Sequence, residues 1–331
     1  MRCLITGATG FVGAHLTELL LARGDEVYGA CWPEPVPESR PGVNLRLCNI
    51  TDAAGLLGFV REAQPDQVYH LAGLSSPLDS LAHQRASYET NFFGALNLLD
   101  AVRQAAPKAR VLLVGSSQCY GAPKAAALPI TEQQPFAPLN PYAVSKAAAD
   151  LLGFQFFSAY GVHVLRARPA NHTGPGQPPS FVCSDFARQV AAIELGMAPA
   201  ELRVGNIEVR RDFSDVRDVV RAYVALVERG RSGEAYNVGS GRSITLKEIV
   251  ETLTGFCSRP IQVIIDSHRM RSNDAKELYV STAKITADTG WASQYPLGVT
   301  LRDLYDYWVS ALKSEPGGSP VKNTTSCWII R

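Results

Sequence analysis

A tyrosine and a lysine four residues apart are the side chains in this sequence best suited to proton transfer. Tyr142 and Lys146 belong to the stretch Tyr142-Ala143-Val144-Ser145-Lys146, and side chains at this spacing share one face of a helix. The Lys146 charge would favour the phenolate and lower the pKa of Tyr142 from its free value of about 10 toward neutral pH, where a general acid or base works best. The pair alone is weak evidence, because the same spacing occurs on many solvated helix faces.

A glycine-rich loop near the start of the chain could hold the phosphates of a dinucleotide. It lies between a short apolar run and an apolar-periodic stretch, as a turn from a first strand to a first helix would. Glycines permit close backbone approach, and free amides at the positive end of a helix receive a pyrophosphate. The cofactor-binding candidates in this loop are Gly7, Thr9, Gly10, Phe11, Val12 and Gly13.

The end of the second expected strand bears on the choice between NADP(H) and NAD(H). A carboxylate at that end would hold the ribose hydroxyls of NAD, whereas an arginine would suit the 2′-phosphate of NADP. The run from Val27 to Trp32 contains no carboxylate, and Arg40 follows after a short loop. The sequence therefore favours NADP(H) and leaves NAD(H) open.

The elements that position these groups alternate between strands and helices. This order builds right-handed β-α-β crossovers and predicts an α/β fold, a doubly wound parallel sheet of the Rossmann type. Strands are expected at Arg2–Thr6, Glu26–Ala30, Leu45–Asn49, Gln67–Leu71, Arg110–Gly115 and Val162–Ala167, and helices at Val12–Arg23, Leu56–Ala63, Tyr88–Ala105 and Pro141–Tyr160.

The chain divides into two expected domains. The regular alternation ends near Arg168, and glycine and proline gather between Gly174 and Pro179. We expect an NAD(P)-binding Rossmann domain over residues 1–168, to which a later segment near 212–230 returns. Residues 169–313 are expected to form mainly a smaller, mixed α/β substrate domain, and residues 314–331 a flexible tail.

A serine at the end of the fifth expected strand completes a set of catalytic groups. Ser116 stands at the carboxyl edge, where ligands bind in doubly wound sheets. With the G-x-x-G-x-x-G loop and the Tyr142 and Lys146 pair, it resembles the extended short-chain dehydrogenases of the sugar-nucleotide epimerase and dehydratase family. The resemblance implies that Ser116 hydrogen-bonds the substrate oxygen, Tyr142 supplies the proton and Lys146 also binds the nicotinamide ribose. It also implies cofactor contacts from Asn49, Ile50, Leu71, Ala72 and Gly73, and substrate contacts from Ser117 and Gln118.

Segments of the second half narrow the resemblance to a substrate class. The stretches Arg168–Gln177, Ser184–Gln189 and Val204–Asp218 are similar to those of reductases that convert GDP-4-keto-6-deoxy-D-mannose to GDP-D-rhamnose. The likeness runs from the first strand through Trp291. A guanidinium fork suits phosphate oxygens, and the resemblance implies contacts to the nucleotide diphosphate of the GDP-sugar from Asn171, Arg188, Arg211 and Arg271.

Other sugar-nucleotide enzymes of this family stay open as alternatives. GDP-mannose 4,6-dehydratases use a glutamate two residues after the catalytic hydroxyl, where this chain has Gln118, and an amide cannot exchange that proton at neutral pH. GDP-fucose synthase epimerises and reduces with a cysteine at that position. Here Cys119 comes one residue late, which reverses side-chain direction on an extended chain. A 6-deoxytalose-forming reductase would differ only in the face that receives hydride. A non-catalytic nucleotide-sensing protein is a remoter alternative, because such proteins commonly lack the tyrosine or the lysine.

Composition argues against several other classes. The chain of 331 residues has 32 Lys plus Arg spread among 31 Asp plus Glu, a balance that gives no sign of a nucleic-acid partner. Seven separated cysteines without a C-x-x-C pair indicate reduced thiols and no metal site. Without a signal-peptide core or a long apolar segment, we expect a cytoplasmic protein with no membrane partner. By resemblance, we expect a homodimer formed through the helices at Tyr88–Ala105 and Pro141–Tyr160.

Overall fold

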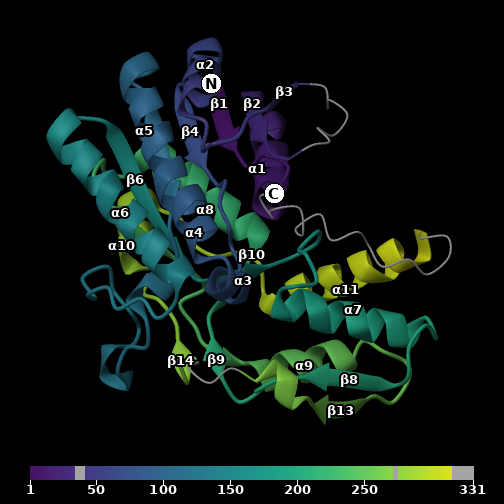
Figure 1. The fold of residues 1–331 in the computed structure, drawn as a ribbon. Helices are drawn as coiled ribbons and strands as arrows, with labels where there is room; N and C mark the ends of the chain where they lie inside the picture. The colour runs from purple at the N-terminus through teal and green to yellow at the C-terminus, as the bar shows by residue number, and fades with distance from the viewer. Residues whose placement is uncertain (34–41, 271–274, 315–331) are drawn as a thin grey trace.

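The computed structural model describes residues 1–33, 42–270 and 275–314. Within these residues the chain builds a seven-stranded parallel sheet with the strand order β11-β6-β5-β4-β1-β2-β3 (Figure 1). The central strands are buried over most of their length, as expected where helices cover both faces. The strands are β1 (Arg2–Thr6), β2 (Glu26–Cys31), β3 (Val43–Leu47), β4 (Gln67–His70), β5 (Arg110–Val114), β6 (His163–Pro169) and β11 (Ala235–Val238).

Two layers of helices cover this sheet and enclose two apolar cores. Along β1, Cys3 and Ile5 enter the first core and Leu4 enters the second, because successive side chains of a strand point to opposite faces. The first core lies under α1 (Phe11–Ala22) and α8 (Val216–Arg229), which pack against each other and occupy one face in Figure 1. The second core lies under α2 (Ala53–Ala63), α5 (Gly94–Ala105) and α6 (Pro141–Tyr160).

The third strand differs from the sequence-based prediction. We expected it at Leu45–Asn49, but β3 begins at Val43, which pairs with Val27 of β2. Asn49 instead lies in a turn, where its side-chain oxygen accepts a hydrogen bond from the Thr51 nitrogen at 3.0 Å. The apolar pairing across the sheet decides where the strand begins.

The helix expected over Tyr88–Ala105 is divided into three pieces. They are α4 (Gln84–Tyr88), a π-helical turn η1 (Glu89–Phe93) and α5. Three further elements were not predicted: α3 (Pro77–Ala82), the edge strand β11, and α10 (Ala283–Thr289), which packs on α8 and β11. A π-helical turn inserts one residue into a helix and is frequent at functional sites.

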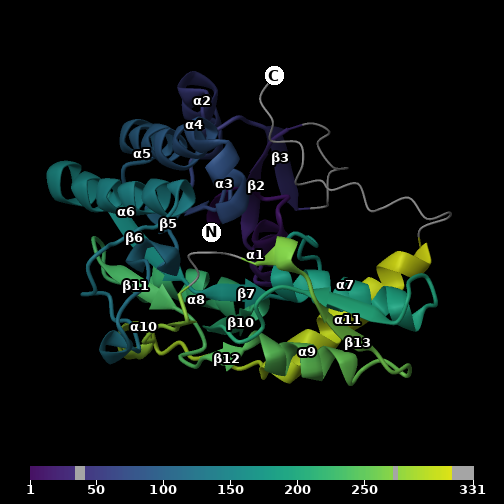
Figure 2. The ribbon, with the colours of Figure 1, turned by 60° about the horizontal axis from the view of Figure 1, so that its bottom comes forward.

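A second, smaller unit lies beneath the carboxyl edge of the sheet (Figures 1 and 2). Its own core contains Phe186, Leu253 and Trp308. The unit is built from α7 (Val182–Glu194), α9 (Leu246–Thr254) and α11 (Leu297–Ser314), with the strand pairs β8 (Glu201–Val204) and β13 (Gln262–Ile265), β7 (Asn171–Thr173) and β10 (Phe213–Asp215), and the small sheet of β12 (Ile244–Thr245), β9 (Arg210–Arg211) and β14 (Glu277–Leu278).

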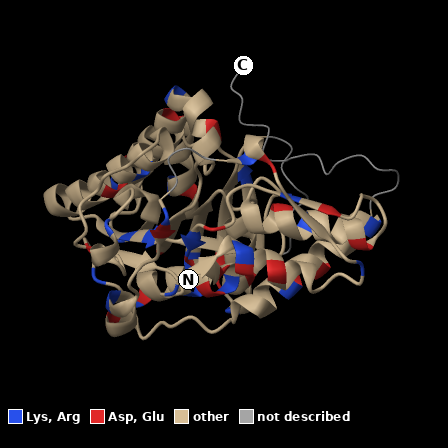
Figure 3. Cartoon of the chain, turned by 90° about the horizontal axis from the view of Figure 1, so that it is seen from below, with Lys and Arg blue, Asp and Glu red and all other residues tan. Residues whose placement is uncertain are grey.

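Basic and acidic residues are interspersed on the helices of this unit (Figure 3). At the edge of this unit, Arg217 of α8 binds the carboxylates of Asp215 of β10 and Asp303 of α11 at 2.6 and 2.7 Å. Among the described residues, no helix combines the length and apolar character needed to cross a membrane. The described chain also contains short 3₁₀ turns at η2 (Ser117–Tyr120), η3 (Ala125–Ala127) and η4 (Ser267–Arg269).

Candidate active site

The candidate site lies at the carboxyl edge of the sheet, beside β1 and β4. The strand order reverses here, because the chain passes from β3 on one side of β1 to β4 on the other. Ligands of doubly wound sheets bind at such a switch point. The glycine loop leaves β1 at this edge, residues 71–73 leave β4, and Ser116 follows β5. Predicted site residues from three strands therefore meet along one edge.

The glycine loop between β1 and α1 allows close backbone approach. Gly7 has a φ of 74°, and a Cβ there would lie 2.9 Å from the Ala72 nitrogen. A Cβ on Gly13 would lie 2.1 Å from the Gly7 carbonyl oxygen. Gly10 is the N-cap of α1 and has no side chain to cap it, so the amides of the first turn stay available to a phosphate. Thr9 is exposed on the same loop, and the cradle fits a pyrophosphate.

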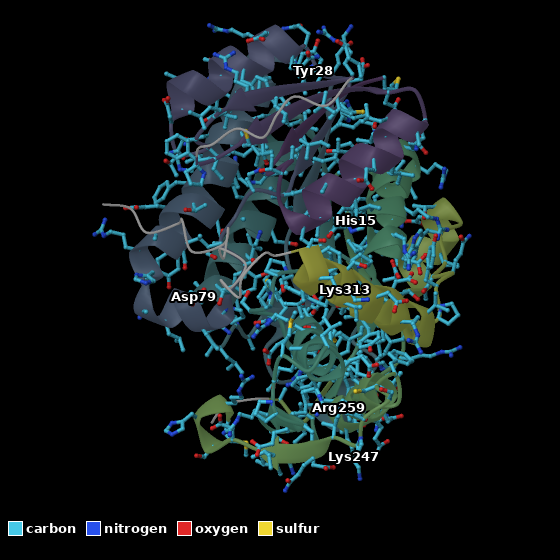
Figure 4. All side chains as sticks on the ribbon, turned by 90° about the vertical axis from the view of Figure 1, so that its right-hand side faces the viewer. His15, Tyr28, Asp79, Lys247, Arg259 and Lys313 are labelled. Carbon is cyan, nitrogen blue, oxygen red and sulfur yellow. The ribbon has the colours of Figure 1, made fainter. Side chains whose placement is uncertain are left out.

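The first turn of α1 contacts the second unit through aromatic rings. Phe11 stacks on His172 with 6.2 Å between ring centroids and 11° between planes. His15, one turn further along α1, places Nε2 2.9 Å from the Pro175 carbonyl oxygen, and Figure 4 shows it on the side of α1 that faces the second unit. Val12 is partly buried against the first core. The cofactor loop and the segment after β6 are thus in direct contact.

The other predicted cofactor residues lie at the ends of β3 and β4. The Asn49 side chain is held by Thr51, as described above, and Ile50 is buried beneath Gly94, where a Cβ would lie 2.5 Å from Ile50 Cδ1. Leu71 and Ala72 are half-buried beside the glycine loop.

The end of β2 carries no carboxylate in its described part. Cys31 is buried and its thiol donates to the Arg46 carbonyl oxygen at 3.4 Å, while Trp32 is exposed. Arg40, the cation that the sequence suggested for a 2′-phosphate, lies outside the described residues. The described part of this strand end would not repel a phosphate.

Ser116, Tyr142 and Lys146 are brought together between β5 and α6. Each is almost buried, with exposed fractions of 6%, 8% and 7%. The Ser116 side chain acts on the Tyr142 phenol by lowering its pKa, and its oxygen accepts a hydrogen bond from the Gln118 nitrogen at 3.2 Å. The Asn140 side chain caps α6 by accepting from its first turn, which fixes Tyr142 at the start of the helix. One turn later, Lys146 Nζ donates to the Val114 carbonyl oxygen at 2.9 Å.

Burial controls the protonation of this trio. It raises the pKa of Tyr142 to about 12, and the hydrogen bond from Ser116 acts in the opposite direction. Burial also lowers the pKa of Lys146 to about 8. Our prediction that Lys146 lowers the pKa of Tyr142 toward neutrality is therefore wrong for this structure. The physical reason is that loss of solvent from the phenol outweighs the favourable interactions, which the sequence spacing could not reveal.

Gly73 and Asn91 form the wall beside Lys146. A Cβ on Gly73 would lie 2.7 Å from Asn91 Oδ1 and 3.3 Å from Lys146 Nζ. Asn91 stands on the π-helical turn, donates from Nδ2 to Ser145 Oγ at 2.9 Å and accepts at Oδ1 from the Leu74 nitrogen at 2.8 Å. Asn91 was not among the predicted site residues. The available signal in the sequence is an asparagine beside an apolar stretch of helical spacing.

The side chains that follow Ser116 point in different directions. Ser117 is buried, and the half-buried Gln118 accepts at Oε1 from Asn140 Nδ2 at 3.5 Å. Cys119 is 1% exposed and its thiol donates to the Ala143 carbonyl oxygen at 3.6 Å. Burial raises the pKa of Cys119 to about 12. This cysteine is a packing residue against α6.

Two of the predicted diphosphate-binding residues lie on short strands of the second unit. Asn171, the first residue of β7, donates from Nδ2 to the Asp212 carbonyl oxygen at 3.1 Å. Arg211 is the last residue of β9 and donates from Nη1 to the Arg210 carbonyl oxygen at 2.8 Å. Both are partly exposed.

The remaining predicted substrate arginines do not join this group in the described structure. Arg188 stands on α7 and lines a hollow of about 250 Å³ with Ala192, Ile193 and Arg203, away from the residues of the trio. Its buried Nε has no hydrogen-bond partner among the described residues. Arg271 lies outside the described residues.

Known proteins with a similar sequence extend over most of this chain. It is 36% identical to the GDP-6-deoxy-D-mannose reductase of Pseudomonas aeruginosa over 95% of this chain and 99% of that protein. It is 30% identical to the GDP-mannose 4,6-dehydratase of Yersinia enterocolitica over 75% of this chain and 70% of that protein.

Solved structures share the fold. The structure of RMD from Pseudomonas aeruginosa complexed with NADPH matches with a TM-score of 0.84 and 35% identity, over 94% of this chain and all of that one. The Thermus thermophilus UDP-glucose 4-epimerase in complex with NAD matches with a TM-score of 0.84 and 28% identity over the same shares. The family model described as GDP-mannose 4,6 dehydratase matches residues 4–304, and the chain therefore belongs to the GDP-mannose 4,6-dehydratase family of extended short-chain dehydrogenases.

Proposed function

We propose that this protein reduces the 4-keto group of GDP-4-keto-6-deoxy-D-mannose to form GDP-D-rhamnose, with NADPH as the favoured hydride donor. The observation that carries the proposal is the cluster of Ser116, Tyr142 and Lys146 beside a phosphate cradle, with the amide of Gln118 where a dehydratase would need a carboxylate. The 36% identity to the Pseudomonas reductase over nearly the full length of both chains supports the same activity.

Tyr142 is placed to be the proton donor. When bound, the nicotinamide supplies the hydride. Because burial keeps the pKa of the phenol at about 12, Tyr142 is protonated at neutral pH, which is the form that a general acid needs. Ser116 is close enough to lower the pKa of the phenol, and its hydroxyl can hold the ketone oxygen beside Tyr142, so the proton travels a short distance to the oxygen on which charge develops.

Lys146 is placed to hold the nicotinamide ribose. One of its N–H groups donates to the Val114 carbonyl oxygen, and the other two donate to no side chain or carbonyl among the described residues, so they can donate to ribose hydroxyls. A pKa of about 8 leaves the ammonium charged at neutral pH. Position 73 beside this ammonium requires glycine, because a Cβ there would collide with Asn91 and crowd Lys146 Nζ.

The choice of NADPH rests on two observations. The described end of β2 has no carboxylate to repel a 2′-phosphate. A solved relative with a TM-score of 0.84 is complexed with NADPH. NAD(H) stays a candidate because the Thermus epimerase, of equal TM-score, binds NAD. The first-turn amides of α1 would hold the pyrophosphate in either case.

We place the nucleotide diphosphate of the substrate near Asn171 and Arg211. Both reach the surface of the second unit beneath the carboxyl edge of the sheet, and an amide and a guanidinium can donate together to phosphate oxygens. Arg188 is the weaker candidate, because it lines a separate hollow.

A 4,6-dehydratase is the main alternative, since relatives at about 30% identity carry that name. That chemistry needs a group that removes and returns a proton on the sugar. Gln118 cannot do so at neutral pH, and the buried thiol of Cys119 is turned toward α6. The site favours the simpler reaction of one hydride and one proton.

We also propose that the protein is a homodimer in a reducing compartment such as the cytoplasm. Leu151 and Phe154 of α6 are 59% and 48% exposed, an unusual state for large apolar side chains on one helix face. Phe93, between α4 and α5, is 49% exposed, so a second copy could cover the helices together.

The described cysteines are unpaired thiols, which suits a reducing environment.

The activity is tested with purified protein, NADPH and GDP-4-keto-6-deoxy-D-mannose. We expect the nicotinamide absorbance to fall as one equivalent of sugar is reduced. Tyr142→Phe should bind NADPH but leave it unoxidised. Incubation with GDP-D-mannose and NADP⁺ tests for dehydratase activity. Wild-type protein that binds both ligands yet leaves NADPH unchanged, or that dehydrates GDP-D-mannose, would overturn the proposal.

A further inference from the structure

Tyr120 is joined to the catalytic serine by a single rigid turn. Ser116 caps η2 and Tyr120 is its last residue. The Cys119 nitrogen donates to the Ser116 carbonyl oxygen at 3.2 Å, and the Gly121 nitrogen donates to the Gln118 carbonyl oxygen at 3.0 Å. A short hydrogen-bonded turn moves as a unit. The position of the Tyr120 side chain therefore constrains the position of Ser116.

Arg168 joins Tyr120 to the helix that carries Tyr142 and Lys146. Its Nη1 donates to the Tyr120 hydroxyl at 2.9 Å, while Nε and Nη2 both donate to the carboxylate of Asp150 at 2.8 Å. Asp150 stands on α6 one turn after Lys146. A paired guanidinium and carboxylate fixes direction as well as distance, so β6 holds the two catalytic segments at a set separation.

The bridge is buried and its hydrogen-bonding groups are satisfied by neighbouring strands and loops. Tyr120, Arg168 and Asp150 are 1%, 6% and 2% exposed. The Tyr120 hydroxyl donates to Asn237 Oδ1 of β11 at 2.8 Å, and the Arg168 guanidinium lies 4.6 Å from the centroid of the Phe136 ring. Buried polar networks of this kind are stiff, because breaking one link leaves a desolvated group without a partner.

We propose that Tyr120 is a positioning residue, which acts through Arg168 and Asp150 to hold Ser116 beside the Tyr142 phenol. This rests on the reductase function proposed above and deepens it. Tyr120 does not touch the reacting atoms. Its hydroxyl joins the turn that Ser116 caps to the helix α6 that carries Tyr142, and its loss lets the two segments separate.

Tyr120→Phe removes the hydroxyl and keeps the ring, which makes it a mild test. A shift of the order of 1 Å between reacting groups can cost about a hundredfold in rate. The Cys119 contact to α6 and the Arg168 pair remain in this variant, so we expect kcat to fall roughly tenfold with little change in KM for either substrate.

Tyr236→Phe is the matched control. Tyr236 is also a buried tyrosine, and its hydroxyl accepts from the Arg231 nitrogen at 2.9 Å and donates to Asp288 at 2.8 Å. None of these partners belongs to the catalytic segments. Both variants should lower the melting temperature, but Tyr236→Phe should leave kcat within about twofold of wild type.

A double-mutant cycle with Ser116→Ala separates positioning from general structure. If Tyr120 acts through Ser116, adding Tyr120→Phe to Ser116→Ala lowers kcat by less than about twofold, because the group being positioned is gone. If the full tenfold loss persists in the Ser116→Ala background, or if Tyr120→Phe leaves kcat of the wild type unchanged, the proposal is wrong.

A second readout needs no turnover and keeps the two proposals distinct. In protein labelled with 3-fluorotyrosine, the ¹⁹F resonance of Tyr142 is the one missing from Tyr142→Phe. Tyr120→Phe should move it in the same direction as Ser116→Ala does, and Tyr236→Phe should leave it in place. An unmoved resonance overturns the positioning role. Wild-type protein that fails to oxidise NADPH overturns the reductase function alone.

Discussion

Replacing Lys146 with methionine should stabilise the folded protein at neutral pH while abolishing reduction. Lys146 is 7% exposed, and burial lowers its pKa from 10.5 to about 8. At about 1.4 kcal/mol per pKa unit, the buried charge costs about 3 kcal/mol of folding free energy relative to the neutral amine. Loss of the hydrogen bond to Val114 offsets about 1 kcal/mol. A methionine of similar length keeps the packing, so the net gain is about 2 kcal/mol.

The stability gained in Lys146→Met should decrease as the pH rises. The pKa of Lys146 is lower in the folded than in the unfolded protein, so the unfolded chain binds more protons between about pH 8 and pH 10.5. The stability of the wild type therefore rises with pH across this window. The advantage of Lys146→Met should be complete below pH 8 and should disappear by about pH 10.5.

Urea unfolding at pH 7 and at pH 10, followed by tryptophan fluorescence, measures this difference. Lys284→Met is the matched control, because Lys284 Nζ binds the Glu234 carboxylate at 2.6 Å and the Ala235 carbonyl oxygen at 2.7 Å. The control should lose stability at both pH values. The reasoning is refuted if Lys146→Met is less stable than wild type at pH 7, or if its advantage is the same at both pH values.

Three further predictions follow from the site and the surface. Tyr142→Phe should lower kcat by roughly 10²–10⁴-fold, the usual cost of losing a general acid, and NADPH affinity in a fluorescence titration should not change; a smaller loss would assign the proton to another group. Gly13→Ala would place a Cβ 2.1 Å from a backbone oxygen, so it should weaken NADPH binding and lower the melting temperature. Gly58→Ala has no atom within 4 Å of its Cβ and should raise the free energy of unfolding by up to about 1 kcal/mol through the helix propensity of α2, so equal effects of the two variants would contradict the loop geometry. Leu151→Glu combined with Phe154→Glu should halve the mass measured by light scattering, and an unchanged mass would place the subunit contact elsewhere.

Local sequence patterns were sufficient to predict many of the strands and helices. The strand Arg2–Thr6 and the helix Pro141–Tyr160 have the bounds that the sequence predicted, because each combines an apolar periodicity with a clear stop at glycine or proline. The third strand begins two residues earlier than predicted, because its start depends on pairing with β2. The edge strand β11 was missed because its four residues follow α8 without a local signal of their own.

The candidate site was predictable in its chemistry and less so in its electrostatics. The spacing of Tyr142 and Lys146 on one helix follows from local geometry. Their pKa values follow from burial by segments far away in the chain, and the direction predicted for the pKa of Tyr142 was wrong. In the bridge from Tyr120 through Arg168 to Asp150, Tyr120 and Arg168 are 48 positions apart and Arg168 and Asp150 are 18 positions apart. No local sequence motif predicts contacts over such separations.

Transfer of an isotope from cofactor to sugar tests the central claim most directly. NADPH that carries deuterium at the transferable position of the nicotinamide would be incubated with the protein and GDP-4-keto-6-deoxy-D-mannose, and the product examined by NMR. The account predicts one deuterium at carbon 4 of GDP-D-rhamnose. A product without deuterium at carbon 4 would contradict reduction by this site, and deuterium at carbon 4 of the 6-deoxytalose isomer would contradict the proposed product.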